Sequence, residues 1–111
     1  MATRQLGRTE WQSYFDGVAR AQQGKQVEIE VAGLSVGHQI EAEWLPLNGL
    51  TYEPKEDVLE VSTESIDHLI HHPKQISVEE DIEGLRSVEI IDQDDNHQII
   101  KLRAPLALPK L

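Results

Sequence analysis

The chain has 111 residues, a length that fits one small domain with a single hydrophobic core. Its composition, 39% hydrophobic and 27% charged, is typical of a folded domain, and the absence of cysteine excludes disulfides, thiolate metal sites and thiol nucleophiles. The net charge of −10 is concentrated in residues 26–97, where 18 acidic residues stand against three basic ones, so nucleic-acid binding is disfavoured.

The acidic residues have two interpretations: they keep a small protein soluble, or they form a face that docks a basic partner or a cation. The N-terminal residues 1–8 lack the apolar core of a signal peptide, and no run of apolar residues reaches the length of a membrane span. We therefore expect a cytoplasmic protein that does not contact a membrane.

An amphipathic helix is the first predicted element. Thr9 and Gln12 match a capping box, and Gly24 is placed to end the helix. The apolar residues recur at positions i, i+3, i+4 and i+7, which predicts one buried stripe made of Trp11, Tyr14, Phe15 and Val18.

After the helix, apolar residues alternate with polar ones, which predicts strands with one buried face. The first such strand covers 27–31, and the second covers 36–44 with His38 on its apolar face, so His38 is expected to be buried. Trp44 has two interpretations, a core residue or part of an exposed apolar lip with the loop that follows it.

Proline and Asn-Gly in 45–50 are expected to break the second strand. Residues 51–57 read as a loop with a short extended piece, and 80–84 as an acidic turn. The segment 65–72 fits either a helical turn or a short strand. Two further strands are predicted, at 58–61 and 75–79.

A β-hairpin is predicted at the end of this region. Residues 87–93 and 97–103 are strand-like, and the three residues between them end in Asn96, which tolerates the left-handed conformation. The register that this loop predicts places Ile90 opposite Ile100 and Glu89 opposite Lys101. On the face opposite to Ile90 and Ile100, this register sets Ile91 against Ile99. These two residues are predicted to form an interface if the helix covers only the face with Ile90 and Ile100.

These elements predict an α+β fold with one N-terminal amphipathic helix and five or six antiparallel strands, in a single domain that spans 1–111. We expect its ordered core at about 8–104 and a flexible tail at 105–111, where two prolines disfavour a strand. A bent sheet or a small Sm-like or SH3-like barrel capped by the helix is the expected architecture, and a flat sheet with the helix across one face is the alternative.

Three clustered histidines are the candidate metal ligands: His68, His71 and His72. Imidazole suits zinc, nickel or copper, and His68 and His71 would share a face if the segment were helical. An exposed polar loop before Pro73 is the favoured interpretation, and a pH-sensitive contact is a further alternative. The D-x-D-x-N pattern at 92–96 lacks the glycine and glutamate of a calcium loop, and no common catalytic or nucleotide-binding motif is present, so we expect no cofactor.

Several short stretches together resemble a family of small bacterial proteins that is described only as a domain of unknown function. They run in order along nearly the whole chain: 9–11 with Phe15, 27–31, 45–50, 68–76 with Pro73, and 102–105. The resemblance implies a bacterial, stand-alone, single-domain protein, and it implies no activity and no functional residues.

Two functions are therefore considered. The first is a small non-catalytic binding or regulatory module that contacts a protein partner or a second copy of itself, with Ile91 and Ile99 as the candidate interface. The alternative is a protein that binds a metal or small ligand through the histidine cluster. The sequence favours the first, without deciding whether the protein is an enzyme.

Overall fold

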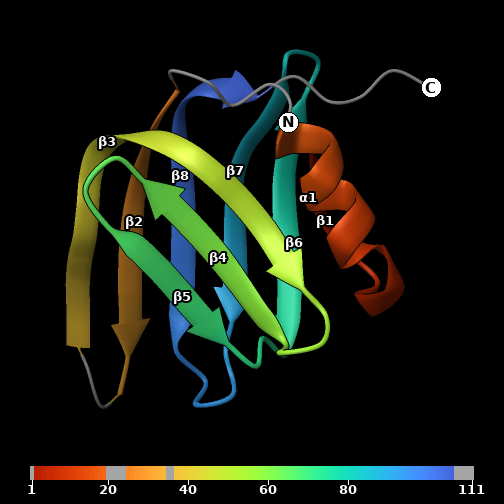
Figure 1. Ribbon diagram of the computed structural model, residues 1–111, viewed down its shortest axis with the longest axis vertical. Helices are drawn as coiled ribbons and strands as arrows, with labels where there is room; N and C mark the ends of the chain where they lie inside the picture. Colours follow the sequence, from red (N-terminus) through yellow and green to blue (C-terminus); the bar gives the residue numbers. More distant parts are fainter. Residues whose placement is uncertain (1, 20–24, 35–36, 107–111) are drawn as a thin grey trace.

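The computed structural model describes residues 2–19, 25–34 and 37–106, and these form one eight-stranded antiparallel sheet and one helical segment (Figure 1). The strands lie in the order β1-β6-β7-β8-β2-β3-β4-β5, so β1 and β5 are the two edges and the sheet is not closed. The elements are β1 (Ala2–Gln5), η1 (Arg8–Glu10), α1 (Trp11–Ala19), β2 (Gln26–Gly33), β3 (Gly37–Glu53), β4 (Val58–Thr63), β5 (Asp67–His71), β6 (Gln75–Asp81), β7 (Gly84–Ile91) and β8 (His97–Leu106).

The predicted antiparallel sheet with an N-terminal helix is confirmed. Two expectations were wrong, because the sheet has eight strands instead of five or six and does not close into a barrel. The extra strands are β1, which precedes the helix and pairs with β6, and β5, which forms from the segment that was ambiguous between helix and strand. The tail was predicted to begin at 105, yet β8 extends to Leu106; residues 107–111 lie outside the described part of the chain.

The sheet folds into two layers because β3 is long and bent. Its first part pairs with β2, and from Leu47 onward it pairs with β4. Two bulges interrupt its pairing with β2, and one of them contains Trp44, whose φ of 52° lies in the left-handed region. Because bulges bend and twist a strand, the end of β3 carries β4 and β5 across the front of β8 and β7 (Figure 1).

A bulge also explains why His38 is exposed when it was predicted to be buried. The consecutive residues Ile29 and Glu30 pair with Ala42 and Ile40, so β3 has one extra residue at this point. The extra residue reverses the alternation: Ala42 points into the core, while Ile40 and His38 share the outer face with Glu30. The His38 Nε2 atom lies 3.1 Å from a carboxylate oxygen of Glu30, in solvent.

The predicted break at 45–50 is wrong, since β3 continues through Pro46 and Asn48. Pro46 has no N–H to donate, but backbone hydrogen bonds continue around it: its carbonyl accepts the N–H of Glu64 at 3.0 Å, and the next amide, that of Leu47, donates to the Lys25 carbonyl at 2.7 Å. Asn48 falls at the register shift between β3 and β4 instead of in a turn. Proline and Asn-Gly thus bend this strand without ending it.

The core lies between the two layers, and α1 closes it at the side of β6 and β1 (Figure 1). Of the four predicted helix-stripe residues, three are buried and Tyr14 is half-buried. Trp11 packs edge-on against Tyr52 of β3, with ring centroids 5.2 Å apart. The largest fully buried side chains come from both layers and from α1: Trp11, Phe15, Ile29, Leu47, Leu50, Leu59, Ile70, Ile76, Leu85, Ile90 and Ile100.

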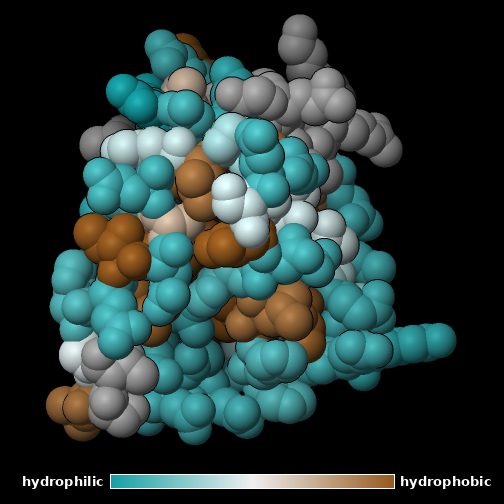
Figure 2. All heavy atoms as spheres, turned by 60° about the vertical axis from the view of Figure 1, so that its left-hand side comes forward, coloured by the Kyte–Doolittle hydropathy of each residue, from teal (hydrophilic) through white to brown (hydrophobic). Residues whose placement is uncertain are grey.

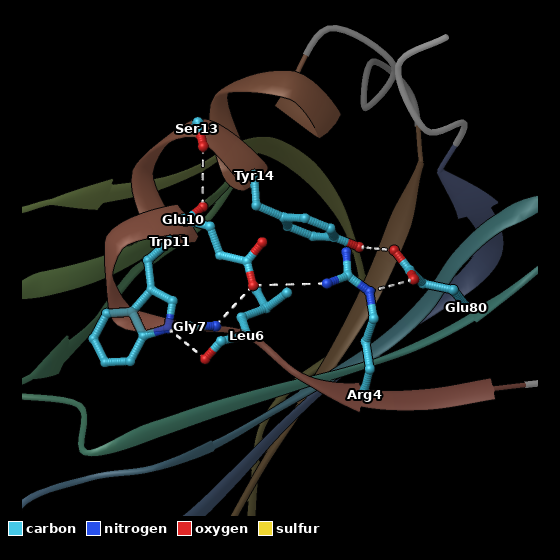
Figure 3. A network of polar contacts seen from close by, with 8 residues as sticks. All are labelled: Arg4, Leu6, Gly7, Glu10, Trp11, Ser13, Tyr14 and Glu80. Atoms are coloured by element: carbon cyan, nitrogen blue, oxygen red, sulfur yellow. Dashed lines mark hydrogen bonds and ion pairs between the residues drawn. The ribbon is translucent and has the colours of Figure 1, made fainter. Parts of the chain in front are cut away.

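Polar contacts at the start of the helical segment differ from the predicted capping box. Glu10, not Gln12, reaches back: its carboxylate accepts the N–H of Gly7 at 2.7 Å, so the helical segment begins two residues earlier than predicted, in η1. Figure 3 shows the same carboxylate beside Arg4, which donates to Glu80 of β6 at 3.0 Å. Tyr14 donates to the other oxygen of Glu80 at 2.5 Å, and this network fixes α1 against β1 and β6.

The β7–β8 hairpin forms as predicted, but its register is shifted by two residues. Val88, not Ile90, pairs with Ile100, and Ile91 pairs with His97. The loop is therefore five residues long, from Asp92 to Asn96, and Asp95 takes the left-handed conformation that was assigned to Asn96. A shift of two residues leaves every side chain on its predicted face.

The Asp92 carboxylate is the physical reason for the longer loop. One oxygen accepts the N–H groups of Asp94 and Asn96 at 2.9 and 3.0 Å. The other accepts the side-chain amides of Gln98 at 2.9 Å and Asn96 at 3.3 Å. A side chain that satisfies so many turn donors outweighs the pairing of Glu89 with Lys101 that the shorter loop would give.

Candidate functional site

A shallow hollow of about 230 Å³ lies on the outer face of the front layer, formed by the end of β3 and by β4 and β5. Two rows of paired residues cross these strands, Thr51–Glu60–Leu69 and Glu53–Val58–His71. With Glu56 from the β3–β4 turn they make up the whole lining of the hollow. Val58 forms its floor, and the Leu69 side chain is 45% exposed at its rim.

The lining of this hollow is acidic. It contains three glutamates and no lysine or arginine, and His71 is the one titratable nitrogen group. Glu53 accepts the N–H of Lys55 at 2.9 Å. Among the residues that the structure describes, Glu56 and Glu60 make no ion pair and no side-chain hydrogen bond. Two carboxylates therefore face solvent here without a compensating cation.

The free edge of β5 borders the same hollow. On its other side β5 pairs with β4, where the N–H of His72 donates to Asp57 and Thr63 donates to Ile66. Since backbone groups alternate in direction along a strand, His68 and Ile70 direct theirs toward β4. Asp67, Leu69 and His71 direct theirs away from it, and in the described chain no further strand pairs with that edge. The residues with free backbone groups thus include the two whose side chains line the hollow.

A polar cluster around Asp57 fixes the end of β5. One Asp57 oxygen accepts the Tyr52 hydroxyl at 2.6 Å and an Arg8 guanidinium N–H at 3.1 Å. The other lies 3.2 Å from Nδ1 of His72. Both Asp57 and His72 have left-handed backbones, with φ of 55° and 52°. The guanidinium of Arg8 also covers the ring of Trp11, 4.8 Å from its centroid, which ties the cluster to the helix.

The electrostatics of this cluster follow from these contacts. Burial, together with the hydrogen bond to Asp57, raises the pKa of Tyr52 to about 12, so the phenol stays a donor. Burial acts to raise the pKa of Asp57, but hydrogen bonds from Tyr52 and His72 and the charge of Arg8 outweigh it, and the pKa is lowered. The Asp57 carboxylate thus joins β3, η1 and the residue that follows β5.

A second polar chain holds β5 from the inside. His68 Nε2 lies 2.6 Å from the side-chain oxygen of Gln98 on β8, whose amide nitrogen donates to Asp92. Gln98 and Asp92 are both buried. At the start of β5, the hydroxyl of Ser62 donates to Asp67 at 2.6 Å. The strand is therefore held at both ends and from the core, while its outer edge is open.

The three predicted histidines do not converge on one point. His68 turns inward to Gln98, whereas the rings of His71 and His72 lie 6.5 Å apart, with His71 at the hollow and His72 against Asp57. The segment is a strand, so neighbouring residues point to opposite faces and the helical i, i+3 arrangement does not arise. Among the described residues, no group of three or more His, Asp or Glu is placed to hold a metal ion.

The candidate interface residues Ile91 and Ile99 lie on β7 and β8, on the outer face of the layer behind β4 and β5, which we call the rear layer. Both are half-buried, and they do not face each other, because Ile99 pairs with Glu89 and Ile91 with His97. A second hollow of about 260 Å³ reaches Ile99, between β1, β6, β7 and β8, and its other lining residues are Thr3, Ser77, Val78, Glu79, Ser87 and Glu89. Trp44 is half-buried under the guanidinium of Arg103, 5.6 Å from the ring centroid, so it is neither a core residue nor a fully exposed lip.

The apolar surface is scattered on the side that Figure 2 displays, where small brown patches are separated by hydrophilic residues. The exposed large apolar residues of the described chain are Leu34, Ile40, Ile66, Leu69 and Ile82. Sequence reasoning missed the β5 edge because the pairing order of strands is not visible in the sequence. The one available signal was the alternation of Asp67, Leu69 and His71 with His68 and Ile70.

Comparison with known proteins identifies the family. The model of the "Family of unknown function (DUF5335)" matches residues 2–111. The chain belongs to this family. An "Uncharacterized protein" from the bacterium Aquifex aeolicus (strain VF5) is 37% identical over 111 residues, which cover 99% of this chain and 100% of that protein. No solved structure matches the chain significantly. The resemblance to a bacterial family of unknown function is thereby confirmed, and no helix among the described residues is long and apolar enough to cross a membrane.

Proposed function

We propose that the protein is a non-catalytic binding module that receives an extended segment of a partner protein along the free edge of β5. The observation that carries the proposal is the coincidence of two features in one strand. Leu69 and His71 offer free backbone groups at the edge, and the same residues line the adjacent hollow. Added strands gain affinity from backbone hydrogen bonds and specificity from pockets for alternate side chains, and this edge supplies both.

The anchoring of β5 supports this proposal. Exposed edge strands template pairing with other chains, and natural proteins commonly protect them. Here the strand is held by Asp57, Ser62 and Gln98, so it is preorganised and an incoming segment orders only itself. The cysteine-free sequence suits a cytoplasmic setting, which we include in the proposal.

A peptide selection tests the proposal. Random twelve-residue peptides displayed on phage are panned against the protein, and a selected synthetic peptide is titrated while amide hydrogen exchange is followed by NMR. In the free protein we expect fast exchange at Leu69 and His71 and slow exchange at Ile70. The peptide is expected to slow exchange at Leu69 and His71; selected peptides that leave these two amides unprotected would refute strand addition.

Two variants sharpen this test. Leu69→Pro removes an N–H that points away from β4, so we expect the fold to persist and peptide binding to be lost. Leu69→Val keeps the N–H and serves as the matched control. If Leu69→Pro unfolds the protein, methylating alternate amide nitrogens of the peptide gives the same information. Only one of the two alternating sets is expected to abolish binding, and equal effects of both sets would contradict the proposal.

Self-association through the outer face of the rear layer is the second candidate. The hollow beside Ile99 favours it, because it adds a concave area to the two half-buried isoleucines. The double variant Ile91→Lys, Ile99→Lys is expected to turn a dimer into a monomer in sedimentation velocity. A folded variant whose sedimentation matches that of the unmodified protein excludes this interface.

A further inference from the structure

We infer that the segment received by β5 alternates basic and apolar residues, with its lysine or arginine side chains over the acidic hollow. This inference rests on the proposed strand addition and specifies the chemistry of the partner. It follows from the side-chain rows of the front layer, from their charge, and from what lies on the inner side of β5.

An added strand would extend both rows of paired residues. Its outward side chains would follow Leu69 and His71 in the rows Thr51–Glu60–Leu69 and Glu53–Val58–His71. Strands lie about 4.8 Å apart, so a residue next to Leu69 is two spacings, on the order of 10 Å, from Glu60. A lysine or arginine side chain bridges that gap with its aliphatic part over the exposed Leu69 and its charge at the carboxylate.

Charge complementarity selects the basic residues. Glu56 and Glu60 have no cation partner among the described residues, and no lysine or arginine lines the hollow. A glutamate or aspartate of the guest would add a like charge to this surface, whereas each exposed ion pair strengthens binding by up to about fivefold. The net charge of −10 attracts a basic segment over a longer range and speeds its association.

The inner side of the guest would meet a different environment. On that side β5 presents Ile70, which is fully buried, and His68, which is half-buried against Gln98. Residues of the guest that point inward would cover the edge of the core between the two layers. Apolar side chains are suited to that position, and their alternation with the basic residues follows from the two-residue period of a strand.

A second copy of the chain is a poor occupant of this edge. The β5 sequence, Asp-His-Leu-Ile-His, contains no lysine or arginine, and its outward residues are Asp67, Leu69 and His71. Pairing two β5 strands would bring two acidic hollows together on chains that each carry a charge of −10. Pairing between two β5 strands is therefore disfavoured, and the proposed occupant is a basic segment of another protein.

Three synthetic nine-residue peptides test the inference, with Lys-Val, Gln-Val and Glu-Val alternation. Their affinities are measured by calorimetry at low and physiological salt against the unmodified protein and two double variants. Glu56→Gln, Glu60→Gln removes the charge of the hollow. Glu41→Gln, Glu43→Gln makes the same change on the first part of β3, where both glutamates are exposed.

We expect the Lys-Val peptide to bind at least tenfold more tightly than the Gln-Val peptide, and the Glu-Val peptide to bind more weakly than both. The hollow variant is expected to reduce the Lys-Val preference to less than about threefold, while the control variant keeps it. Equal binding of the Lys-Val and Gln-Val peptides, both abolished by Leu69→Pro, would overturn the basic partner and leave strand addition standing.

Other outcomes would also contradict the proposed function. Lys-Val binding that persists in Leu69→Pro, or that survives methylation of each of the two alternating sets of peptide amides in turn, would show attraction without strand pairing and overturn both proposals. A dimer in sedimentation velocity that Leu69→Pro dissociates would identify the occupant of the edge as a second copy, and it would overturn the basic partner.

Discussion

Replacing Asp92 with alanine is expected to cost about 3 kcal/mol of unfolding free energy, because this carboxylate organises the β7–β8 loop. It accepts four hydrogen bonds, two from backbone amides of the loop and two from the side chains of Asn96 and Gln98. Hydrogen bonds to a charged group contribute on the order of 1.5–3 kcal/mol each, but the loop amides can bind water once released, and the Asn96 bond is long.

Most of the expected loss arises at Gln98. Its side chain is 7% exposed, and without Asp92 its amide nitrogen would be buried without a partner, at about 1–3 kcal/mol. With the loop contacts, a total of about 3 kcal/mol corresponds to a decrease in melting temperature of about 12 °C for a chain of this length. Since Gln98 also contacts His68, the same variant is expected to weaken the inner support of β5.

Urea unfolding at pH 7, followed by tryptophan fluorescence, measures this loss. The matched control is Asp94→Ala, which removes an exposed carboxylate two residues away that makes no side-chain hydrogen bond among the described residues, and it is expected to change stability by less than about 0.5 kcal/mol. A loss below 1 kcal/mol for Asp92→Ala, or equal losses for the two variants, would refute the assigned role of the carboxylate.

The contribution of Asp92 also has a defined pH dependence. Burial acts to raise its pKa, but the hydrogen bonds from Gln98 and from the loop outweigh burial, and the pKa is lowered in the folded state. The unfolded chain therefore binds this proton more readily, and the contribution is complete above the unfolded value of about 3.9. As the pH falls through the folded-state pKa, we expect the stability difference between the unmodified protein and Asp92→Ala to shrink.

Two further predictions concern β2 and the tyrosines. A Cβ atom at Gly33 would lie 1.9 Å from Oδ1 of Asn96, so Gly33→Ala is expected to lower the melting temperature, and less so when Asn96 is also replaced by glycine. Burial and a hydrogen bond to a carboxylate raise the pKa of both tyrosines, Tyr52 to about 12 and Tyr14 further, so absorbance at 295 nm is expected to show no tyrosinate at pH 10. The stabilisation from neutral tyrosines is complete below pH 10 and is lost as the pH rises through the folded-state values; half-titration at pH 10 would contradict it.

Local patterns predicted local structure well. The helix with Trp11 and Phe15, the alternating strand at 27–31 and the existence of the last hairpin were all correct, because each depends on the periodicity of neighbouring residues. The hairpin register was wrong by two residues, since the capping preference of the Asp92 side chain outweighed a single cross-strand ion pair. A shift that preserves faces is invisible to hydrophobic patterning.

The sequence by itself determined the class of the fold, the faces of its regular strands, its acidic charge and the absence of thiol chemistry. Only the tertiary structure decided that β3 bends at Trp44 into a second layer, that His68 turns away from His71 and His72, and that β5 is an open edge beside an acidic hollow. The physical reason is that periodicity records which side of a strand is buried, whereas bulges and strand order depend on which distant segments meet. The lining of the candidate site is local, because it comes from residues 51–71, but its open edge depends on strand order, since no distant strand of the described chain pairs with the outer side of β5.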